Sequence, residues 1–121
     1  LLPVLISEGH FRRGIPLHRI VEVLAGNPAQ EMGLAHTKGS IVIGHDADVA
    51  VVDLKRRWTL DRGKLVSSAG YSIYEGWQFR GQVVHTVVRG RPVLRDNQLL
   101  ADSQGWGRYQ RRHALYRASV G

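Results

Sequence analysis

The sequence predicts an α+β fold in which helices come first, a block of β-strands follows and a basic tail ends the chain. Apolar residues from position 17 to position 24 recur at the spacing of one helix face, whereas those after Gly33 form short β-type runs that turn residues divide. Helices and strands that are segregated along a chain are typical of α+β proteins or of two separate structural pieces. They are not typical of a wound βαβ sheet.

The composition bounds the class of protein. A chain of 121 residues suits one domain or part of a larger one. It contains no cysteine, which excludes disulfides and thiolate metal sites, and none of its apolar runs reaches the roughly 20 residues that span a bilayer. Its first residues include neither an initiator Met nor the features of a signal peptide, so we expect an internal segment or a processed chain that is cytoplasmic.

The helices are expected within residues 1–34. The first ten residues are too short a run for periodicity to decide between helix and strand. Pro16 suits the first position of a helix, because its missing N–H costs nothing there. The apolar face of that helix is then formed by Leu17, Ile20, Val21 and Leu24.

This helix is expected to stop at Gly26 and Asn27-Pro28, where a second, short helix begins. Asn27 is a good N-cap, Gln30 can complete a capping box, and Gly33 can supply the left-handed residue that ends the helix. The pair is a helix-turn-helix only in topology. Its second helix is too short for DNA recognition and has no Arg, Lys or Asn on a reading face.

Residues 35–100 are predicted to form strands joined by turns. The expected strands are Ile41–Ile43, Val49–Leu54, Trp58–Leu60, Phe79–Val88, Pro92–Leu94 and Gln98–Leu100. The expected turns are Gly44–Ala47, Arg89–Arg91 and Asp96-Asn97. Asp61–Gly76 has no clear period and is predicted to be irregular, with Tyr71 and Tyr74 as anchors. Pro92 cannot donate a ladder hydrogen bond, so its strand should lie at an edge or begin there.

Histidines are the first candidates for a metal site or a general base. No two of them have the i, i+2 spacing of a strand pair or the i, i+4 spacing of a helix pair. The best local group of possible ligands is His45-Asp46-Ala47-Asp48, and a turn held by Asx hydrogen bonds is the favoured interpretation of it. The six histidines are His10, His18, His36, His45, His85 and His113.

Three other groups give no complete site. Ser7-Glu8 with His10 could serve as nucleophile, acid and base, but residues so close in sequence rarely converge on one reacting atom. Thr37–Ser40 lacks the upstream glycine of a phosphate-binding loop and precedes a strand. Asp53 ends an apolar strand, and a structural hydrogen bond to a nearby turn is favoured over catalysis. We therefore assign no catalytic, metal-binding or cofactor-binding residue to this chain.

The C-terminal residues are strongly basic. The net charge is +7, and Gly105–Gly121 contains four arginines and no acid. Its aromatic residues Trp106, Tyr109 and Tyr116 permit a nucleic-acid interpretation. The favoured interpretation is a tail that packs on a neighbouring subunit or a missing domain through arginine forks.

The sequence resembles the C-terminal portion of a cyclic amidohydrolase of the hydantoinase/dihydropyrimidinase group, to which dihydroorotases and allantoinases are related. The similarity covers essentially the whole chain in order, and Gly107-Arg108-Tyr109 favours the hydantoinase branch over the allantoinases. The residues that carry it are Leu2-Pro3, Ser7-Glu8-Gly9, Arg12–Ile15, Asn27-Pro28-Ala29, Met32-Gly33-Leu34, Lys38-Gly39-Ser40-Ile41, Gly44, Asp46-Ala47-Asp48, Tyr71–Gly76, Gly81–Val84 and Val87–Gly90.

The resemblance implies a parent enzyme that hydrolyses the C–N bond of a cyclic amide or imide such as a hydantoin or dihydropyrimidine. Members of the family bind two divalent metal ions, often zinc, inside a (β/α)8 barrel through an HxH pair, a carboxylated lysine, two further histidines and an aspartate. This sequence has no such set, because in the family those residues lie upstream of the position that matches Leu1. We therefore expect a structural portion that is inactive as an isolated chain.

The resemblance also implies a division of the chain. Residues 1–34 would be closing helices of the barrel, residues 35–100 part of a small β-sandwich, and residues 101–121 a basic tail. The expected partners are the missing N-terminal part of the same protein or other subunits of a homo-oligomer, with no membrane. A non-enzymatic oligomerisation module is the alternative, and a nucleic-acid-binding domain is a less favoured one.

Overall fold

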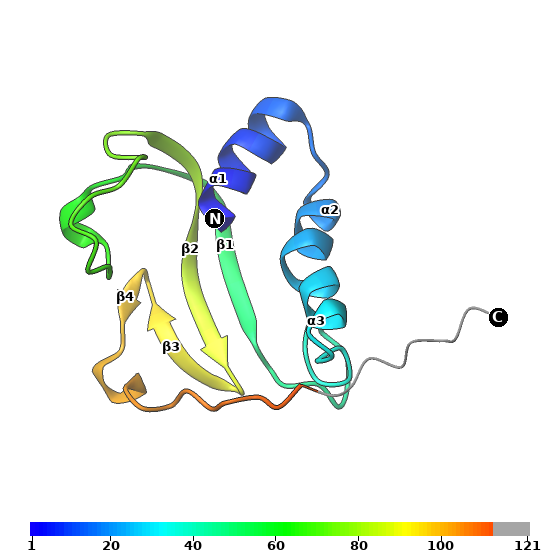
Figure 1. Ribbon diagram of the computed structural model, residues 1–121. Helices are drawn as coiled ribbons and strands as arrows, with labels where there is room; N and C mark the ends of the chain where they lie inside the picture. The colour runs from blue at the N-terminus through cyan, green and yellow to red at the C-terminus, as the bar shows by residue number, and fades with distance from the viewer. Residues whose placement is uncertain (113–121) are drawn as a thin grey trace.

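The structure, a computed structural model, describes residues 1–112, and the helices of residues 2–31 lie on one side of an antiparallel sheet (Figure 1). The predicted α+β class is confirmed. The helical segments are α1 (Leu2–Val4), η1 (Leu5–Arg12), α2 (Leu17–Val21), η2 (Glu22–Gly26), α3 (Asn27–Glu31), η3 (Arg62–Lys64) and η4 (Ala101–Ser103). The strands are β1 (Val49–Thr59), β2 (Gln78–Val88), β3 (Arg91–Arg95) and β4 (Gln98–Leu99).

The first ten residues are helical, which periodicity left undecided. α1 continues directly into η1, a π-helical segment. Gly14 then adopts a left-handed backbone at φ +71°, and its N–H donates to the carbonyl of His10 at 3.1 Å. The N–H of Ile15 donates to Gly9 at 3.0 Å. A left-handed glycine ends the helix sharply because it lets these N–H groups satisfy the last carbonyls.

The second helix contradicts the expected break at Gly26 and Asn27-Pro28. α2, η2 and α3 form one continuous helix, and both Gly26 and Asn27 have right-handed helical backbones. The N–H of Asn27 donates to the carbonyl of Glu22, five residues earlier. This wider π-helical turn leaves room for the proline ring and makes its missing N–H less costly. The predicted N-cap and capping box are therefore wrong, since no side-chain cap hydrogen bond forms at the start of α3.

The end of this helix agrees with the prediction. Gly33 has a left-handed backbone at φ +65°, and its N–H donates to Gln30 at 3.0 Å. The N–H of Leu34 donates to Ala29 at 2.7 Å, which completes a Schellman motif. Gly39 then brings the chain back against α3. A Cβ at Gly39 would lie 2.6 Å from that of Ala29, so only glycine fits this approach.

The sheet is an antiparallel meander in the order β1-β2-β3-β4. The predicted strands Val49–Leu54 and Trp58–Leu60 are largely one strand, β1, whose pairing with β2 shifts register twice. One shift lies between Asp53 and Arg57, where the Asp53 carboxylate accepts the N–H of Lys55 at 2.9 Å. Irregular pairing of this kind bends a strand without ending it.

The later strands and turns agree with prediction. The predicted strand at Phe79–Val88 is β2. Residues 89–90 and 96–97 have positive φ throughout, as two-residue hairpin turns require. β4 pairs only with Leu94 and Arg95 of β3, so Pro92 lies where β3 has the character of an edge strand.

Two predictions in the β block are wrong. Ile41–Ile43 is irregular, and the side chains of Ile41 and Ile43 are almost fully exposed. In the part of the chain that the structure describes, no strand lies alongside to accept its backbone hydrogen bonds. Tyr71 is exposed as well, so Tyr74 alone anchors the irregular stretch, with its ring edge-on to Trp77 at 5.2 Å.

The core is small. Ile6 and Phe79 are buried where the first helix meets the sheet, and Ile20 packs near Gly9. An aromatic cluster surrounds Phe79, with ring centroids at 5.1 Å for Trp58 and 6.3 Å for both Tyr74 and Trp77. Such pairs add to burial through their edge and face geometry. Among residues 1–112 there is no helix with the length and apolar character to cross a bilayer.

Candidate functional site, a cleft between the first helix and strands β1 and β2

Close packing fixes the first helix on β2. Gly81 has φ +90°, and a Cβ there would lie 2.5 Å from Cγ2 of Ile6, so the helix approaches the strand backbone itself. The Ser7 hydroxyl accepts the backbone N–H of Arg80 at 3.1 Å, although 73 residues separate the two in sequence. The indole N–H of Trp58 donates to the Gly81 carbonyl at 3.0 Å, which ties β1 to the same point.

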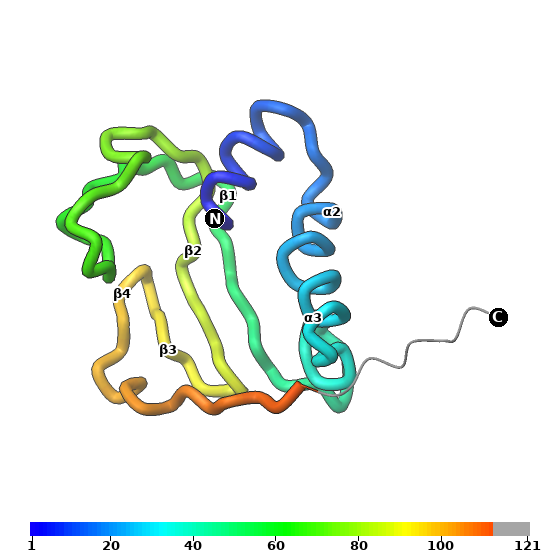
Figure 2. The backbone as a smooth tube through the Cα atoms, viewed as in Figure 1, coloured from blue at the N-terminus to red at the C-terminus, as the bar shows by residue number. Residues whose placement is uncertain are grey.

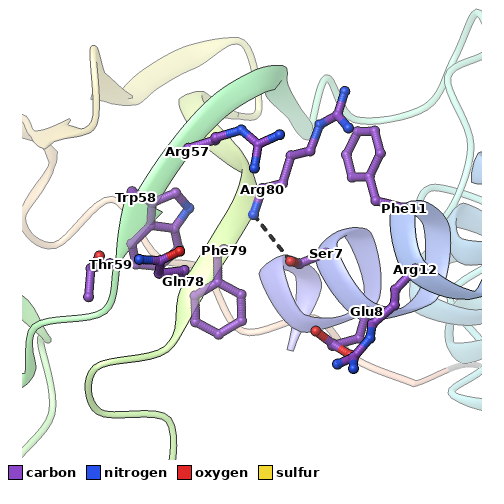
Figure 3. A pocket seen from close by; sticks show the side chains of 10 residues that line it. All are labelled: Ser7, Glu8, Phe11, Arg12, Arg57, Trp58, Thr59, Gln78, Phe79 and Arg80. Carbon is purple, nitrogen blue, oxygen red and sulfur yellow. Dashed lines mark hydrogen bonds and ion pairs between the residues drawn. The ribbon is translucent and has the colours of Figure 1, made fainter.

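Beside this contact lies a cleft of about 570 Å³ (Figure 3). Arg57 and Arg80 stand directly opposite each other on β1 and β2. The Arg80 guanidinium lies over the ring of Phe11, 3.8 Å from its centroid. The other lining residues are Ser7, Glu8, Arg12, Trp58, Thr59, Gln78 and Phe79.

The charge of the cleft is positive. Glu8 is the one carboxylate that lines it, and Arg12 already binds Glu8 at 3.0 Å. Within residues 1–112, neither Arg57 nor Arg80 forms an ion pair. The lining residues include no histidine or second carboxylate for proton transfer, so the arrangement suits binding of an anion rather than bond cleavage.

None of the described histidines lines the cleft, although the ring of His10 contacts that of Phe11 with centroids 4.8 Å apart. The ring N–H of His10 can donate to the Ile15 carbonyl at 2.9 Å, and Nδ1 of His85 lies 3.3 Å from the Asp96 backbone nitrogen. His18 and His36 are exposed, and His113 lies outside the described residues. In residues 1–112 no three His, Cys, Asp or Glu side chains gather as a metal site requires.

The group of Ser7, Glu8 and His10 does not converge on one point. Ser7 binds the Arg80 backbone, Glu8 binds Arg12, and His10 faces the Ile15 carbonyl. Asp53 holds the irregular part of β1, as its favoured structural role predicts. The residues Thr37–Ser40 precede an irregular segment instead of a strand. Gly39 within them packs against α3.

The turn around His45 is held by a network of charges. Nζ of Lys38 binds both Asp46, at 2.8 Å, and Asp48, and the other Asp48 oxygen accepts the N–H of Arg89 at 2.7 Å. Nδ1 of His45 lies 3.1 Å from the hydroxyl of Ser40. The network joins the loop after α3 to the β2–β3 turn, which agrees with a structural interpretation of these aspartates.

The same network shifts two pKa values. Burial acts to lower the pKa of Lys38, but hydrogen bonds and charges from Asp46 and Asp48 outweigh it and raise that pKa. Burial acts to raise the pKa of Asp48, but hydrogen bonds from Lys38 and the Arg89 backbone outweigh it and lower that pKa. Each group is thus held in its charged form.

Two clusters were missed by sequence reasoning. One is the Arg57–Arg80 pair, which only the strand register brings together. The other is Trp106, whose ring contacts both Arg89 and Arg91, with guanidinium carbons 4.6 and 5.0 Å from the ring centroid. The indole N–H of Trp106 also donates to the Val88 carbonyl at 2.8 Å. The two arginines that flank Gly90 at the β2–β3 turn were the available signal for this second cluster.

Comparison with known proteins decides the family. A model of the amidohydrolase family matches residues 9–94. The chain belongs to the amidohydrolase family. An allantoinase of Solibacter usitatus is 38% identical over 104 residues, which are 86% of this chain and 22% of the relative. A dihydroorotase of Methanothermobacter thermautotrophicus is 40% identical over 109 residues, which are 90% of this chain and 23% of the relative.

Solved structures agree with this membership. A D-hydantoinase (dihydropyrimidinase) from a Thermus species superposes with a TM-score of 0.90 and 31% identity, over 95% of this chain and 25% of that one. The resemblance to the hydantoinase/dihydropyrimidinase group and its relatives is therefore confirmed. This amidohydrolase chain spans between a fifth and a quarter of the length of each of these relatives.

Proposed function

We propose that this chain is the C-terminal structural portion of a metal-dependent cyclic amidohydrolase, with hydantoin-like or dihydropyrimidine-like substrates, and that it is inactive alone. In this proposal residues 1–34 close a (β/α)8 barrel, residues 35–100 contribute to a β-sandwich and residues 101–121 form a basic tail. The described residues do not fit a two-metal site, because no ligand group gathers among them. The divalent metals, often zinc in this family, would be held elsewhere in a cytoplasmic parent protein.

An unfilled apolar groove carries the proposal. It lies between the helix of residues 17–31 and strand β1, measures about 760 Å³, and is lined mainly by apolar side chains such as Val21, Met32 and Val52. Val21 on this helix and Met32 directly after its end are 59% and 60% exposed, although the helix faces the sheet (Figure 2). A concave surface lined mainly by apolar side chains, two of them more than half exposed, suits a contact with further polypeptide.

The edge of β1 supports the same conclusion. β1 has 11 residues and stands at one end of the sheet, so within residues 1–112 only β2 pairs with it. The exposed run Ile41–Ile43 precedes it in the chain. Natural proteins usually cover a long strand edge, because its free N–H and C=O groups recruit other strands. We infer that the remainder of the amidohydrolase polypeptide covers both the edge and the groove.

A chimera tests the proposal. The matching segment of the Thermus D-hydantoinase would be replaced by this chain, and hydantoin hydrolysis by the chimera would be measured beside that of the truncated enzyme. Activity in the chimera together with none in the truncated enzyme is the expected result. Failure of the chimera to fold or hydrolyse, with a control graft from a second hydantoinase active, would contradict it.

The isolated chain supplies a second test. With Zn²⁺ or Mn²⁺ added, we expect no turnover of hydantoins or dihydropyrimidines. Turnover above background that a chelator abolishes would show a complete site and overturn the proposal.

A non-enzymatic oligomerisation module is the second candidate, because the same open strand edge could pair with another copy. Sedimentation at micromolar concentration separates the two. A dimer or larger oligomer of the isolated chain favours the module, whereas a sharp monomer counts against it. Nucleic-acid binding would instead weaken steeply with salt.

A further inference from the structure

We propose that Arg57 and Arg80 form an oxyanion-binding site, which takes a carboxylate or phosphate group in the cleft beside the first helix. The proposal is independent of the parent activity. It rests on the register of β1 and β2, on the lack of an ion pair at either arginine within residues 1–112, and on the way in which the Arg80 side chain is held.

The register forces two positive charges together. Arg57 and Arg80 are direct partners in the antiparallel pair, and Figure 3 shows the Arg57 side chain extending toward Arg80. Like charges directly opposite on one face destabilise a sheet. Within residues 1–112, four other arginines do have carboxylate partners: Arg12, Arg19, Arg56 and Arg91. The pair in the cleft is left without one.

The surroundings hold the Arg80 side chain in place. Its guanidinium rests on the face of Phe11 at 3.8 Å, and its backbone N–H is bound by the buried Ser7 hydroxyl. A stacked arginine loses less side-chain freedom when it binds, and its planar fork matches two oxygens of one anion. The cleft therefore presents a prearranged donor instead of a freely moving surface charge.

Polar groups extend the site along the strands. Thr59 and Gln78 are paired two residues from the arginines, so strand alternation places all four side chains on one face. The hydroxyl and the amide of this pair can donate further hydrogen bonds to a bound oxyanion. With Arg12 occupied by Glu8, the two opposed guanidinium groups supply the charge that selects an anion.

The test compares anions on the full chain. Thermal unfolding would be followed in low-salt buffer with inorganic phosphate, with glutarate, and with sodium chloride at matched ionic strength, because general screening by salt must be separated from binding. We expect a saturable rise in melting temperature with phosphate or glutarate beyond that with chloride. A larger effect of phosphate assigns a phosphate ligand, and a larger effect of glutarate assigns a carboxylate.

Substitutions locate the effect. Arg57→Gln should weaken anion binding about tenfold, the loss expected for one charge-assisted hydrogen-bonding group. Without an anion it should raise the melting temperature, because it removes the repulsion with Arg80. Arg13→Gln is the control, since Arg13 is exposed outside the cleft and forms no ion pair within residues 1–112. Arg80→Lys keeps the charge without the fork and should weaken binding less than Arg57→Gln.

The proposal fails in either of two cases. One is a melting temperature that phosphate and glutarate raise no more than chloride does. The other is anion binding in Arg57→Gln that equals binding in Arg13→Gln. Arg57 is exposed, so its substitution should leave the fold intact, and circular dichroism would verify this before each titration.

Discussion

The two helices of this chain meet the sheet in opposite ways. The first helix touches β2 so closely that Gly81 has no room for a Cβ beside Ile6. The second helix leaves an apolar groove between itself and β1, with Val21 and Met32 exposed. The first contact is complete within the chain, whereas none of residues 1–112 fills the second. One chain can therefore be fully packed at one interface and open at another.

The largest expected effect is at the closed contact. Gly81→Val combines a left-handed backbone with a Cβ 2.5 Å from Ile6, so it should lower the free energy of unfolding by about 3 kcal/mol or more. Gly44→Ala is the matched control, since Gly44 has φ +95° but open space around its Cβ position, and it should cost only about 1 kcal/mol. Urea denaturation measures both. Equal losses would show that backbone strain alone, and not the helix contact, makes Gly81 necessary.

The next largest difference is expected between side-chain truncations on the first and the second helix. Ile6→Ala removes a side chain that is only 3% exposed and should cost about 2–4 kcal/mol. Val21→Ala removes one that is 59% exposed in the groove and should change stability by about 0.5 kcal/mol or less. Similar losses in the two variants would mean that the groove is already filled in solution, for example by a second copy.

The Lys38–Asp48 network should give a smaller, pH-dependent effect. The pKa of Asp48 is lowered in the fold, so its stabilisation is present above the unfolded value and is lost as pH falls below about 4. The pKa of Lys38 is raised, so its stabilisation is lost only as pH rises above about 10.5. Because the Asp48 side chain is 34% exposed, the contribution should not exceed about 1 kcal/mol.

Asp48→Asn tests this network. Between pH 5 and pH 3 the free energy of unfolding of the variant should fall less than that of the wild type. This interval spans the usual carboxylate pKa of about 3.9. Glu22→Gln, which breaks the exposed ion pair with Arg19, serves as the control and should leave the acid dependence nearly unchanged. Parallel acid curves for Asp48→Asn and the wild type would exclude a stabilising role for Asp48.

The smallest effect is expected for a charge in the groove. Met32→Lys replaces a side chain that is 60% exposed by a charged one, so the free energy of unfolding of the isolated chain should change by about 0.5 kcal/mol or less. In the hydantoinase chimera the same change should weaken assembly, because the groove would then be covered and the charge desolvated. A neutral result in both settings would leave the groove without a structural role.

Local chemistry explains which parts of the fold could be predicted. The Schellman motif at Gly33 and the turn at Asp96-Asn97 need particular residues at particular backbone angles, and those residues identify them in sequence. The continuous helix through Pro28 was mispredicted because a π-helical turn can absorb a proline that an α-helix cannot. The run Ile41–Ile43 was mispredicted because strand propensity is satisfied only where a partner strand lies beside it.

The sequence by itself determined the order of helices before strands, the turn positions and the family, because these depend on periodicity, on glycine and proline chemistry and on linear motifs. Only the tertiary structure decided that the first helix packs against the backbone of Gly81, that Arg57 faces Arg80 and that a groove separates the second helix from β1. Those features join residues from 23 to 75 positions apart. Strand register and the packing distance between layers set them, and neither is a property of any local stretch of chain.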